Sequence, residues 1–593
     1  MKHKTANTTQ DTSQAAPDPC MEQSYHVFML PFIVKEDVNP KHLEERLSVY
    51  DTTKWIHVCD KVLSDEEEAR KAYNASKYFN KAAFEALHQT TKPPHKSWHR
   101  QHKDEVLEEF ELKNLDPSRS YYRLDLNHFS AHLQLQSVRV KLYSHNIGQI
   151  LYRTYYNEAL FQKDKERKTV ESYSYLDAVE DINSYGRRVS LPFVPQPKQG
   201  SYADQLTATA VTAEISVSIN TESSHSTTSY KTDFDQMAKS IVPAGSTAHT
   251  YQENAHHTIA KHAVGIIFNS TIREDKYHET IIPVYDDRMI LASIISSDKA
   301  ANLIPGYTKF KGFDEETLSR ISIYETEPDK APYPNDMTAY KDARRLYGII
   351  SCDSHSDFPT VRDASMLQKL MHKFSLDRWN EYKSYTGVSH HAFVMIKPPR
   401  DDNAFLFDNF LDLYAEMVSL VVAQRTALLN ILHNTSEASR SIKGIHSLGL
   451  RATSRVAKIK QDIAVFTANI NLLDITEQEQ GDETYTKIRE NLGVNTLSHN
   501  VKEQMEGLSD AAQAIRSSVY NAAAFAVAVG ALVIEIEIDK FLPNESIKVF
   551  IACDSPLIPL CFSLPNEILK VLITIISVLL VFFISRRIAR KKR

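Results

Sequence analysis

The sequence of 593 residues is poor in features that mark several large classes of protein. Its five cysteines form no CxxC pair and no zinc-like spacing, which predicts reduced thiols in a mainly cytosolic chain, with Cys553 and Cys561 as the exception if their loop lies outside the membrane. Glycine is scarce, at 15 residues, and this favours long helices. The net charge is -6 and no basic face stands out, so we expect no direct binding to nucleic acid.

Common enzyme motifs are absent as well. The sequence holds no GKS/T phosphate loop, no GxSxG elbow and no HExxH metal motif, and we therefore predict that the protein is not an enzyme. The N-terminal residues 1–24 are polar and lack the apolar core of a signal peptide. We expect a disordered tail there, followed by a cytoplasmic domain.

Two apolar segments near the C-terminus predict membrane spans. The first is 517–538, of which 517–534 is uncharged, and the second is 564–585; both approach the roughly 20 apolar residues that a spanning helix needs. Basic residues follow the second segment at 586–593, whereas the loop 539–563 is acidic. The positive-inside rule then places both termini in the cytoplasm and the loop outside. A membrane protein with two spans in a lipid bilayer is expected; a soluble helical hairpin is the alternative for the first segment.

The remaining chain divides into two predicted regions. Residues 25–400 mix short β-like runs with helical stretches, which predicts an α/β or α+β domain. The strand-like runs are 137–156, 206–219, 262–272, 288–296 and 344–353, and 64–88 reads as a helix. Residues 401–516 show apolar positions every three or four residues, typical of long packed helices with coiled-coil-like seams. The last apolar stripe continues into the first span, so 495–538 is predicted to form one helix about 66 Å long at 1.5 Å per residue.

This layout resembles the CorA-type divalent-cation channels. Several stretches are similar to a bacterial CorA-like family, namely HNIGQILYRTYYN (145–157), DINSYGRRVSLPF (181–193), DDRM (286–289), FLDLYAEMVSLVVAQRTALL (410–429) and DITEQEQGDETYTKIRENLGV (474–494). The resemblance implies a CorA-like homo-oligomer, a pentameric ring, that conducts divalent cations such as Mg²⁺. Two spans in one chain cannot enclose a pore. A pore therefore requires a ring of subunits, independently of the resemblance.

One departure from this family changes the expected function. Magnesium-selective members carry Gly-Met-Asn after the first span, and here that place holds IEIEIDKF, at 534–541. CorA-like proteins without Gly-Met-Asn include the membrane effectors found beside type III CRISPR systems, in which a nucleotide second messenger acts on the cytoplasmic domain. The resemblance therefore implies an antiviral channel gated by such a ligand. The alternatives are a constitutive divalent-cation transporter and a membrane-anchored scaffold.

Polar residues of the first span are candidates for an ion path. Asn521 lies near the start of the span, and Glu535, Glu537 and Asp539 lie at its outer end. Carboxylates in a ring of subunits concentrate cations at a pore mouth. Because residues i, i+2 and i+4 do not share one helical face, Glu535 and Asp539 can point together while Glu537 points away. The alternative is that the acids only end the span at the water interface.

Two short stretches are candidates for ligand binding. The first, NSYGRR, supplies Asn183, Tyr185, Arg187 and Arg188, and the second, SLDRWNEY, supplies Arg378 and Trp379. Arginine forks suit phosphate or carboxylate groups, and an aromatic ring can stack on a base. A structural salt bridge at the start of a strand is the alternative for each.

A third polar stretch, CDSHSD, places Asp353, His355 and Asp357 in alternation after a predicted strand. A metal or hydrolytic site is one hypothesis for this pattern, and a polar turn is the other. The histidine pairs at 256–257 and 390–391 have no recognised ligand spacing. The residues themselves therefore identify no particular metal or cofactor.

Overall fold

The computed structural model describes the following residues: 20–34, 55–58, 73–87, 107–113, 115–126, 129–143, 147–167, 173–187, 212–220, 225–233, 281–284, 288–324, 332–353, 360–443, 450–541, 548–549 and 562–563. They divide into two compact units, which are described separately. Unit 1 comprises residues 1–432 and 462–501, and unit 2 comprises 433–461 and 502–593.

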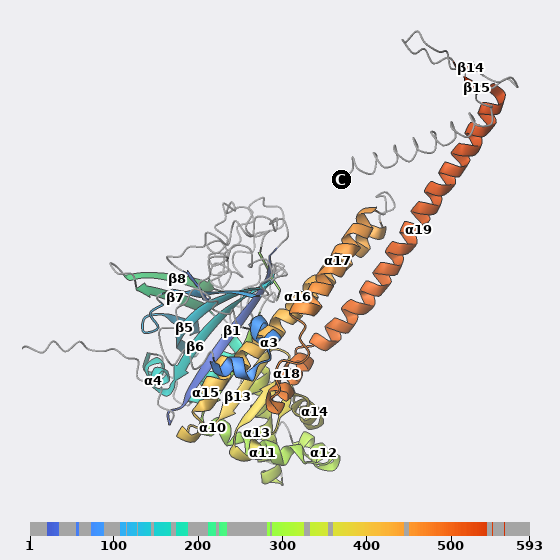
Figure 1. The fold of residues 1–593 in the computed structure, drawn as a ribbon. Coiled ribbons are helices and arrows are strands. Elements are labelled where there is room, and N and C mark those ends of the chain that lie inside the picture. Colours follow the sequence, from blue (N-terminus) through green and yellow to red (C-terminus); the bar gives the residue numbers. More distant parts are fainter. Residues whose placement is uncertain are drawn as a thin grey trace, which may run out of the picture. The chain divides into compact units, whose positions relative to one another are not determined.

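Unit 1 is a mixed α/β domain built on a sheet of 13 strands (Figure 1). The main path of the sheet runs β11-β12-β13-β10-β1-β6-β5-β4-β7-β8. The strand bounds are β1 Gln23–Val34, β2 Trp55–His57, β3 Leu107–Leu112, β4 Tyr121–Asp125, β5 Ser130–Tyr143, β6 Ile147–Asn157, β7 Thr212–Asn220, β8 His225–Asp233, β9 Ile281–Pro283, β10 Ile290–Ser296, β11 Ser375–Leu376, β12 Tyr385–Val388 and β13 Ala392–Lys397. The predicted mixture of helices and a sheet is confirmed.

Most neighbouring strands are antiparallel, and their sequences explain their positions. β5 alternates half-buried and buried residues, as expected for a strand with one face on the core. β10 is buried at every position, and it pairs in parallel with β13 on one side and antiparallel with β1 on the other. The predicted strand-like runs are confirmed where the structure describes them as β5 and β6 (137–143 and 147–156), β7 (212–219) and β10 (290–296). The run 262–272 lies outside the described residues.

The strand predicted at 344–353 is wrong. These residues form the end of α13 (Pro334–Ser351), which continues to Ser351 before Cys352 adopts a left-handed conformation with φ 55°. The β-branched pair Ile349 and Ile350 favours a strand locally, yet the apolar residues upstream recur at helical spacing. Proline at the first helical position also suits the start of this helix. Tertiary burial of one helical face therefore overrides the local preference.

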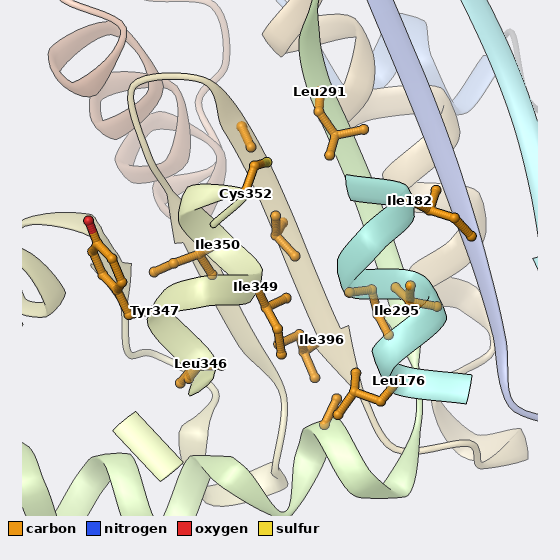
Figure 2. Packing of buried hydrophobic residues seen from close by; sticks show 14 of the residues in the cluster. Leu176, Ile182, Leu291, Ile295, Leu346, Tyr347, Ile349, Ile350, Cys352 and Ile396 are labelled. Carbon is orange, nitrogen blue, oxygen red and sulfur yellow. The ribbon is translucent and has the colours of Figure 1, made fainter. Parts of the chain in front are cut away.

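The main core lies between the sheet and a set of short helices. α5 (Tyr175–Tyr185) begins with a capping box between Ser174 and Asp177. Figure 2 shows Ile182 of α5 and Ile349 of α13 in the same apolar cluster as Ile396 of β13. Further helices in unit 1 are α3 (Lys81–Leu87), α4 (Glu158–Arg167), α10 (Asp298–Ala301), α11 (Leu303–Lys311), α12 (Glu315–Ile323) and α14 (Ala364–Phe374). α3 and the helical residues 73–78 confirm part of the helix predicted at 64–88.

Long helices follow the sheet, as predicted. They are α16 (Ala415–Lys443), α17 (Leu450–Asn469), α18 (Glu479–Asn491) and α19 (Val494–Phe541). Two short elements, α15 (Phe405–Asn409) and the π-helix η8 (Phe410–Tyr414), lead into α16. α19 confirms the single helix predicted over 495–538 and is 48 residues long. Gly493, between α18 and α19, has φ +73°, a left-handed conformation that favours glycine.

Buried polar groups attach α16 to the sheet. Lys141 of β5 is fully buried, forms an ion pair with Glu416 and donates a hydrogen bond to the Leu87 carbonyl at 3.1 Å. Gln149 of β6 donates to the Ser419 carbonyl at 2.8 Å. Burial of an ion pair is tolerated when further hydrogen bonds satisfy its atoms, as they do here. These contacts fix the rotation of the first turns of α16 against unit 1.

Within unit 2, parts of α16, α17 and α19 contact one another. Thr435 lies 3.7 Å from the sulfur of Met505, and Lys460 donates to the Ser509 hydroxyl at 2.6 Å. Met505, Leu508 and Ala512 are buried at the steps of three and four predicted for a helical seam. A two-stranded sheet, β14 (Lys548–Val549) with β15 (Phe562–Ser563), occurs in the predicted outer loop.

In the part of the chain that the structure describes, no helix combines the length and the apolar character that a membrane crossing requires. The first predicted span, 517–538, is helical as part of α19, but the environment of most of its side chains lies outside the description. The second predicted span, 564–585, and the basic tail 586–593 lie outside the described residues, as do residues 1–19.

Candidate functional site

Strand β13 separates the main core from a pocket in unit 1. Alternate residues of a strand point to opposite faces of the sheet. Val394 belongs to the main core, whereas Phe393, Met395 and Lys397 line the pocket; Ile396 belongs to the core and also borders the pocket. Phe393 also stacks on Phe410 with ring centroids 6.4 Å apart. The pocket therefore lies on the face of the sheet opposite α13.

We call this cavity of about 440 Å³ the aromatic pocket. Its size falls within the range of small-molecule sites. Its walls come from β10, the segment 376–386, β13, the segment 400–414 and α18. Its lining residues are Ile294, Leu376, Arg378, Trp379, Tyr382, Ser384, Tyr385, Thr386, Phe393, Met395, Ile396, Lys397, Arg400, Asp402, Asn403, Phe405, Leu406, Asn409, Tyr414, Gln480, Glu483 and Thr484.

Three large aromatic side chains of this pocket are exposed to solvent. Trp379 is 47% exposed, Tyr382 69% and Phe405 56%. The rings of Trp379 and Tyr382 lie 6.0 Å apart between centroids in a tilted arrangement. An exposed apolar cluster beside a cavity is typical of a binding surface, because such rings gain free energy when a ligand covers them.

Hydrogen bonds hold the segment that carries these rings. Asp377 accepts from the Tyr307 hydroxyl at 3.2 Å and from the Asn380 amide at 2.9 Å, and it forms an ion pair with Lys311. Lys383 adopts a left-handed conformation with φ 55° after the short 3₁₀ helix η6 (Asn380–Tyr382). The segment is therefore positioned by its neighbours before any ligand arrives, which lowers the entropic cost of binding.

Arg378 connects the pocket wall to α18. Its Nε donates to Glu483 at 3.0 Å, and its guanidinium lies 3.3 Å from Glu479. These contacts raise the pKa of Arg378, chiefly through the hydrogen bonds to Glu483 and Glu479. Both carboxylates are solvent-exposed, and exposed ion pairs of this kind stabilise a fold only weakly.

Lys397 provides a second cation, and it is buried. Its ammonium donates to the Asn403 side chain at 2.6 Å and lies 4.5 Å from the centre of the Phe407 ring. Burial lowers the pKa of Lys397 to about 8, although Asp402 opposes this shift. No carboxylate in the described residues forms an ion pair with Lys397.

α18 joins the pocket to the helix that follows. Gln480, Glu483 and Thr484 of α18 line the pocket. At the other end of α18, the Asn491 amide donates to the Val388 carbonyl at 2.9 Å and to the Lys373 carbonyl at 3.2 Å. α19 begins three residues later, after Gly493. One helix therefore contacts both the cavity and the start of the 48-residue helix.

The pocket contains one of the two ligand stretches predicted from sequence. Arg378 and Trp379 line it, while NSYGRR does not. Asn183 is buried, with its carbonyl oxygen 2.9 Å from His26, and Arg187 is buried and donates to the Met289 carbonyl at 3.4 Å. Tyr185 ends α5, and Arg188 lies outside the described residues. Asn183 and Arg187 therefore bind protein groups inside the core.

The structure describes few contacts for the other predicted site residues. Asn521, Glu535, Glu537 and Asp539 belong to α19, and their side chains lie outside the description. Asp353 follows a helix rather than a strand and accepts from the Thr360 amide at 2.8 Å.

His355 and Asp357 fall outside the described residues. Among the residues that the structure describes, no group of three or more His, Cys, Asp or Glu side chains could hold a metal ion.

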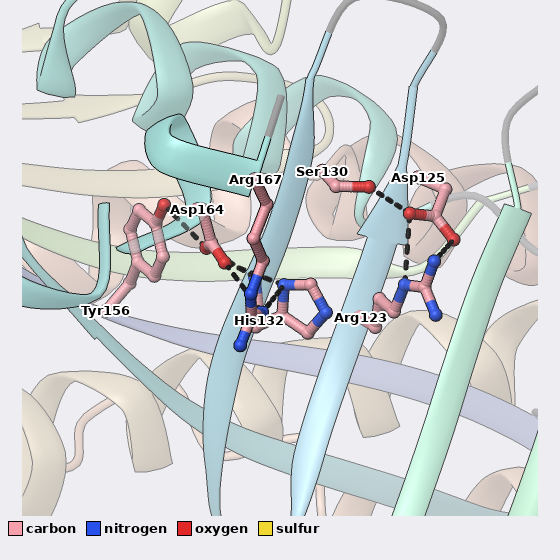
Figure 3. Close-up of polar contacts among 7 residues, drawn as sticks. All are labelled: Arg123, Asp125, Ser130, His132, Tyr156, Asp164 and Arg167. Atoms are coloured by element: carbon pink, nitrogen blue, oxygen red, sulfur yellow. Dashed lines mark hydrogen bonds and ion pairs between the residues drawn. The ribbon is translucent and has the colours of Figure 1, made fainter. Parts of the chain in front are cut away.

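A second polar cluster lies on β5, β6 and α4 (Figure 3). Asp164 of α4 is buried and accepts from the His132 amide at 2.8 Å and from the Tyr156 hydroxyl at 3.1 Å. Its other oxygen lies 2.7 Å from Nδ1 of His132 and 3.3 Å from Arg167. We call this the Asp164 cluster. Asp164 is saturated with protein donors, which indicates that it anchors α4 to the sheet.

Sequence reasoning missed Lys397, Tyr382 and Phe405. The stretch AFVMIKPP holds the signal for Lys397, because strict alternation from Phe393 places the lysine on the same face as Met395. Tyr382 lies only three residues from Trp379, which was predicted. Phe405 comes from a separate segment, and only the fold brings it to the pocket.

Comparison of this chain with protein-family models, with curated proteins and with solved structures finds no match.

Proposed function

We propose that the chain is a ligand-gated membrane channel of CorA-like layout, in which the aromatic pocket binds the ligand and α19 carries the response. The observation that carries this proposal is the path from the pocket to α19. α18 lines the pocket, and α19 starts three residues after α18 ends and continues through the apolar stretch 517–534. A site in unit 1 is thus covalently linked through helices to the predicted membrane segment.

The gating mechanism is a shift between two arrangements of α18. A ligand that fills the pocket contacts Gln480, Glu483 and Thr484 on the α18 wall as well as Trp379 on the wall formed by the segment 376–386. The ligand favours the arrangement in which both walls contact it. The size of this shift is set by the difference in the ligand's affinity for the two arrangements. Gly493, with φ +73°, allows the chain to turn sharply between α18 and α19. A change in α18 is therefore passed directly to the first turn of α19.

The proposed ligand is a nucleotide second messenger, and the proposed biological role is that of an antiviral effector of the type III CRISPR kind. Support comes from the rings and cations of the pocket, which suit the bases and phosphates of a nucleotide. The CorA-like layout of the sequence supplies the remaining expectations, which are a pentameric ring in a bacterial inner membrane with both termini in the cytoplasm. The protein performs no covalent chemistry in this scheme.

Ions pass along the first span in this proposal. Asn521 lines the path, and Glu535 and Asp539, which share a helical face, form a ring of carboxylates at its outer mouth. The Gly-Met-Asn sequence of magnesium-selective channels is absent, so the permeant ion is left for experiment to identify, with Mg²⁺ and K⁺ as the two to measure first.

The test is ion flux from liposomes that contain the purified full-length protein. Mg²⁺ and K⁺ are measured separately, before and after addition of a panel of nucleotide second messengers. We expect flux only when one of these nucleotides is present, and we expect Trp379→Ala to need more of it. The matched control is Tyr73→Ala, since Tyr73 is also an exposed aromatic residue but does not line the pocket.

The other outcomes separate the alternatives. Mg²⁺ flux without any nucleotide would support the constitutive transporter, and a well-inserted protein that conducts nothing would support the scaffold. Replacing Glu535 and Asp539 by Gln and Asn should reduce cation flux. Unchanged flux would rule out the proposed ring of carboxylates at the mouth, and it would not bear on the ligand site.

A further inference from the structure

Lys397 is a buried cation whose charge is not balanced by direct contact with a carboxylate. The residue is 1% exposed. Its described contacts are the Asn403 side chain at 2.6 Å, the Pro398 carbonyl at 3.4 Å and the face of Phe407 at 4.5 Å. Buried charges in proteins are generally paired, because removal of an ion from water is costly. The cation is held here by dipoles and a ring instead.

The position of Lys397 connects this charge to the aromatic pocket. Lys397 lies on the same strand face as Phe393 and Met395, and all three line the cavity. Asn403, which accepts its hydrogen bond, lines the cavity as well. An ammonium has three donor hydrogens, and two of them are directed to Asn403 and Pro398. Among the described residues, the third hydrogen has no partner other than the face of Phe407, so an anion that reaches the ammonium can accept it.

The other charged groups of the pocket leave Lys397 as its innermost cation. Arg378 is engaged by Glu479 and Glu483 of α18. Arg400 and Asp402 are exposed, and Asp402 is the carboxylate that partly compensates the charge of Lys397. An anion that binds beside Lys397 would meet a charge that Asp402 compensates only in part, in buried surroundings of low dielectric, where the attraction is strongest.

The rest of the lining selects a flat ring. Trp379, Tyr382 and Phe405 offer exposed aromatic faces, on which a planar ring stacks favourably. We propose that the ligand of the aromatic pocket is a planar aromatic molecule carrying a phosphate or a carboxylate, and that Lys397 binds this anionic group. This inference rests on the pocket being the ligand site of the proposed function, and it adds the residue that anchors the anionic group of the ligand.

The experiment measures binding alone, by titration calorimetry on the full-length protein in nanodiscs. Two pairs of probes differ only in or near the anionic group: AMP with adenosine, and indole-3-acetate with the uncharged alcohol tryptophol. We expect at least one anion to bind about tenfold or more tightly than its neutral counterpart, a typical gain for a hydrogen bond to a charged group. The pair that shows the difference distinguishes phosphate from carboxylate.

Two variants assign the difference to Lys397. Lys397→Met removes the charge, and Asn403→Asp keeps the shape of residue 403 but places a carboxylate against the ammonium. Each should reduce the preference for the anion to about threefold or less while binding of the neutral compound is preserved. Lys369→Met is the matched control, because Lys369 is exposed and does not line the pocket. Asn403→Asp retains Lys397 and so still gives an answer if Lys397→Met fails to fold.

The proposal is overturned if none of the four compounds binds at millimolar concentration. It is also overturned if anions and neutral compounds bind equally well, or if both variants keep the preference. These outcomes are independent of ion flux. Anion-selective binding without flux would therefore sustain the inference and reject the channel, whereas flux triggered equally by uncharged ligands would do the reverse.

Discussion

The Asp164 cluster and the aromatic pocket use similar groups in opposite ways. In the cluster, buried Asp164 receives donors from His132, Tyr156 and Arg167, so its charge is satisfied by the protein itself. In the pocket, buried Lys397 has an amide, a carbonyl and a ring around it and no carboxylate in direct contact within the described chain. A saturated cluster stabilises a fold, whereas an incompletely compensated charge beside a cavity is available to a ligand.

The largest expected effect is on stability, at Asp164. Replacing Asp164 by Ala leaves the buried Tyr156 hydroxyl and the His132 amide without their acceptor, and we expect the free energy of unfolding to fall by about 3 kcal/mol. Thermal unfolding followed by circular dichroism measures this loss, and calorimetry with the four probes should show unchanged binding. The control is Asp125→Ala, because Asp125 is partly exposed and pairs with Arg123. Equal losses in the two variants would contradict the structural role of Asp164.

A pH effect of slightly smaller size is expected from His26. Burial lowers the pKa of this imidazole to about 4, from an ordinary value of 6.5. Below pH 6.5 the unfolded chain takes up a proton that the folded His26 resists, so stability falls as the pH decreases from 6.5 towards 4. The slope contributed by this residue is at most about 1.4 kcal/mol per pH unit.

The measurement is the melting temperature at pH 7, 6 and 5, in the wild-type protein and in His26→Gln. The glutamine retains polar atoms towards Asn183 and Ser24, which both lie 2.9 Å from the imidazole. We expect a shallower decline in the variant. Parallel pH profiles would show that other groups dominate acid sensitivity.

Trp379 should affect ligand binding and leave stability almost unchanged. Its ring is about half exposed, so Trp379→Ala should change the free energy of unfolding by less than about 0.5 kcal/mol. Loss of stacking should weaken binding of a ring-containing probe by about tenfold. Calorimetry with the tightest of the four probes measures this, again with Tyr73→Ala as the matched control. A variant that unfolds readily would instead place Trp379 among the structural residues.

Replacement of Glu483 should give the smallest effect, and it should strengthen ligand binding, whereas replacement of Trp379 weakens it. The carboxylate occupies Arg378 and adds negative charge to the pocket wall. Glu483→Gln should therefore tighten binding of the anionic probe by roughly threefold, with no change for its neutral partner, since exposed ion pairs are weak. Glu316→Gln, an exposed acid on α12, serves as the control. Weaker anion binding in Glu483→Gln would mean that Glu483 contacts the ligand directly.

The sequence predicts periodic elements better than it predicts sites. Alternation in β5 and the three-and-four spacing of α16 to α19 are local signals, and each follows directly from the burial of one face. The error at 344–353 arose because Ile349 and Ile350 favour a strand, whereas their burial in α13 depends on residues far away in sequence. The pocket has the same property, since β13, η6, α15 and α18 meet only after folding.

The candidate site was therefore predicted in part. Arg378 and Trp379 are adjacent in the sequence and could be recognised as a pair. Asn183 and Arg187 carry similar chemistry, and their burial cannot be read from their immediate neighbours. Lys397 has an ordinary side chain, and its distinctive surroundings are created by Asn403 and Phe407 after the chain turns back.

The π-helix η8 determines more than the local shape of residues Phe410–Tyr414. A π-turn contains one more residue than an α-helix needs over the same length, so it acts as a built-in insertion. Deleting one residue here would convert the turn to α-helix and rotate the residues on one side of it by about 100° relative to those on the other. Either Phe405, Leu406 and Asn409 of α15 would leave the pocket wall, or Glu416 would leave Lys141. The extra residue thus sets the rotation about the helix axis at which the residues of the pocket wall and of the buried ion pair can both make their contacts.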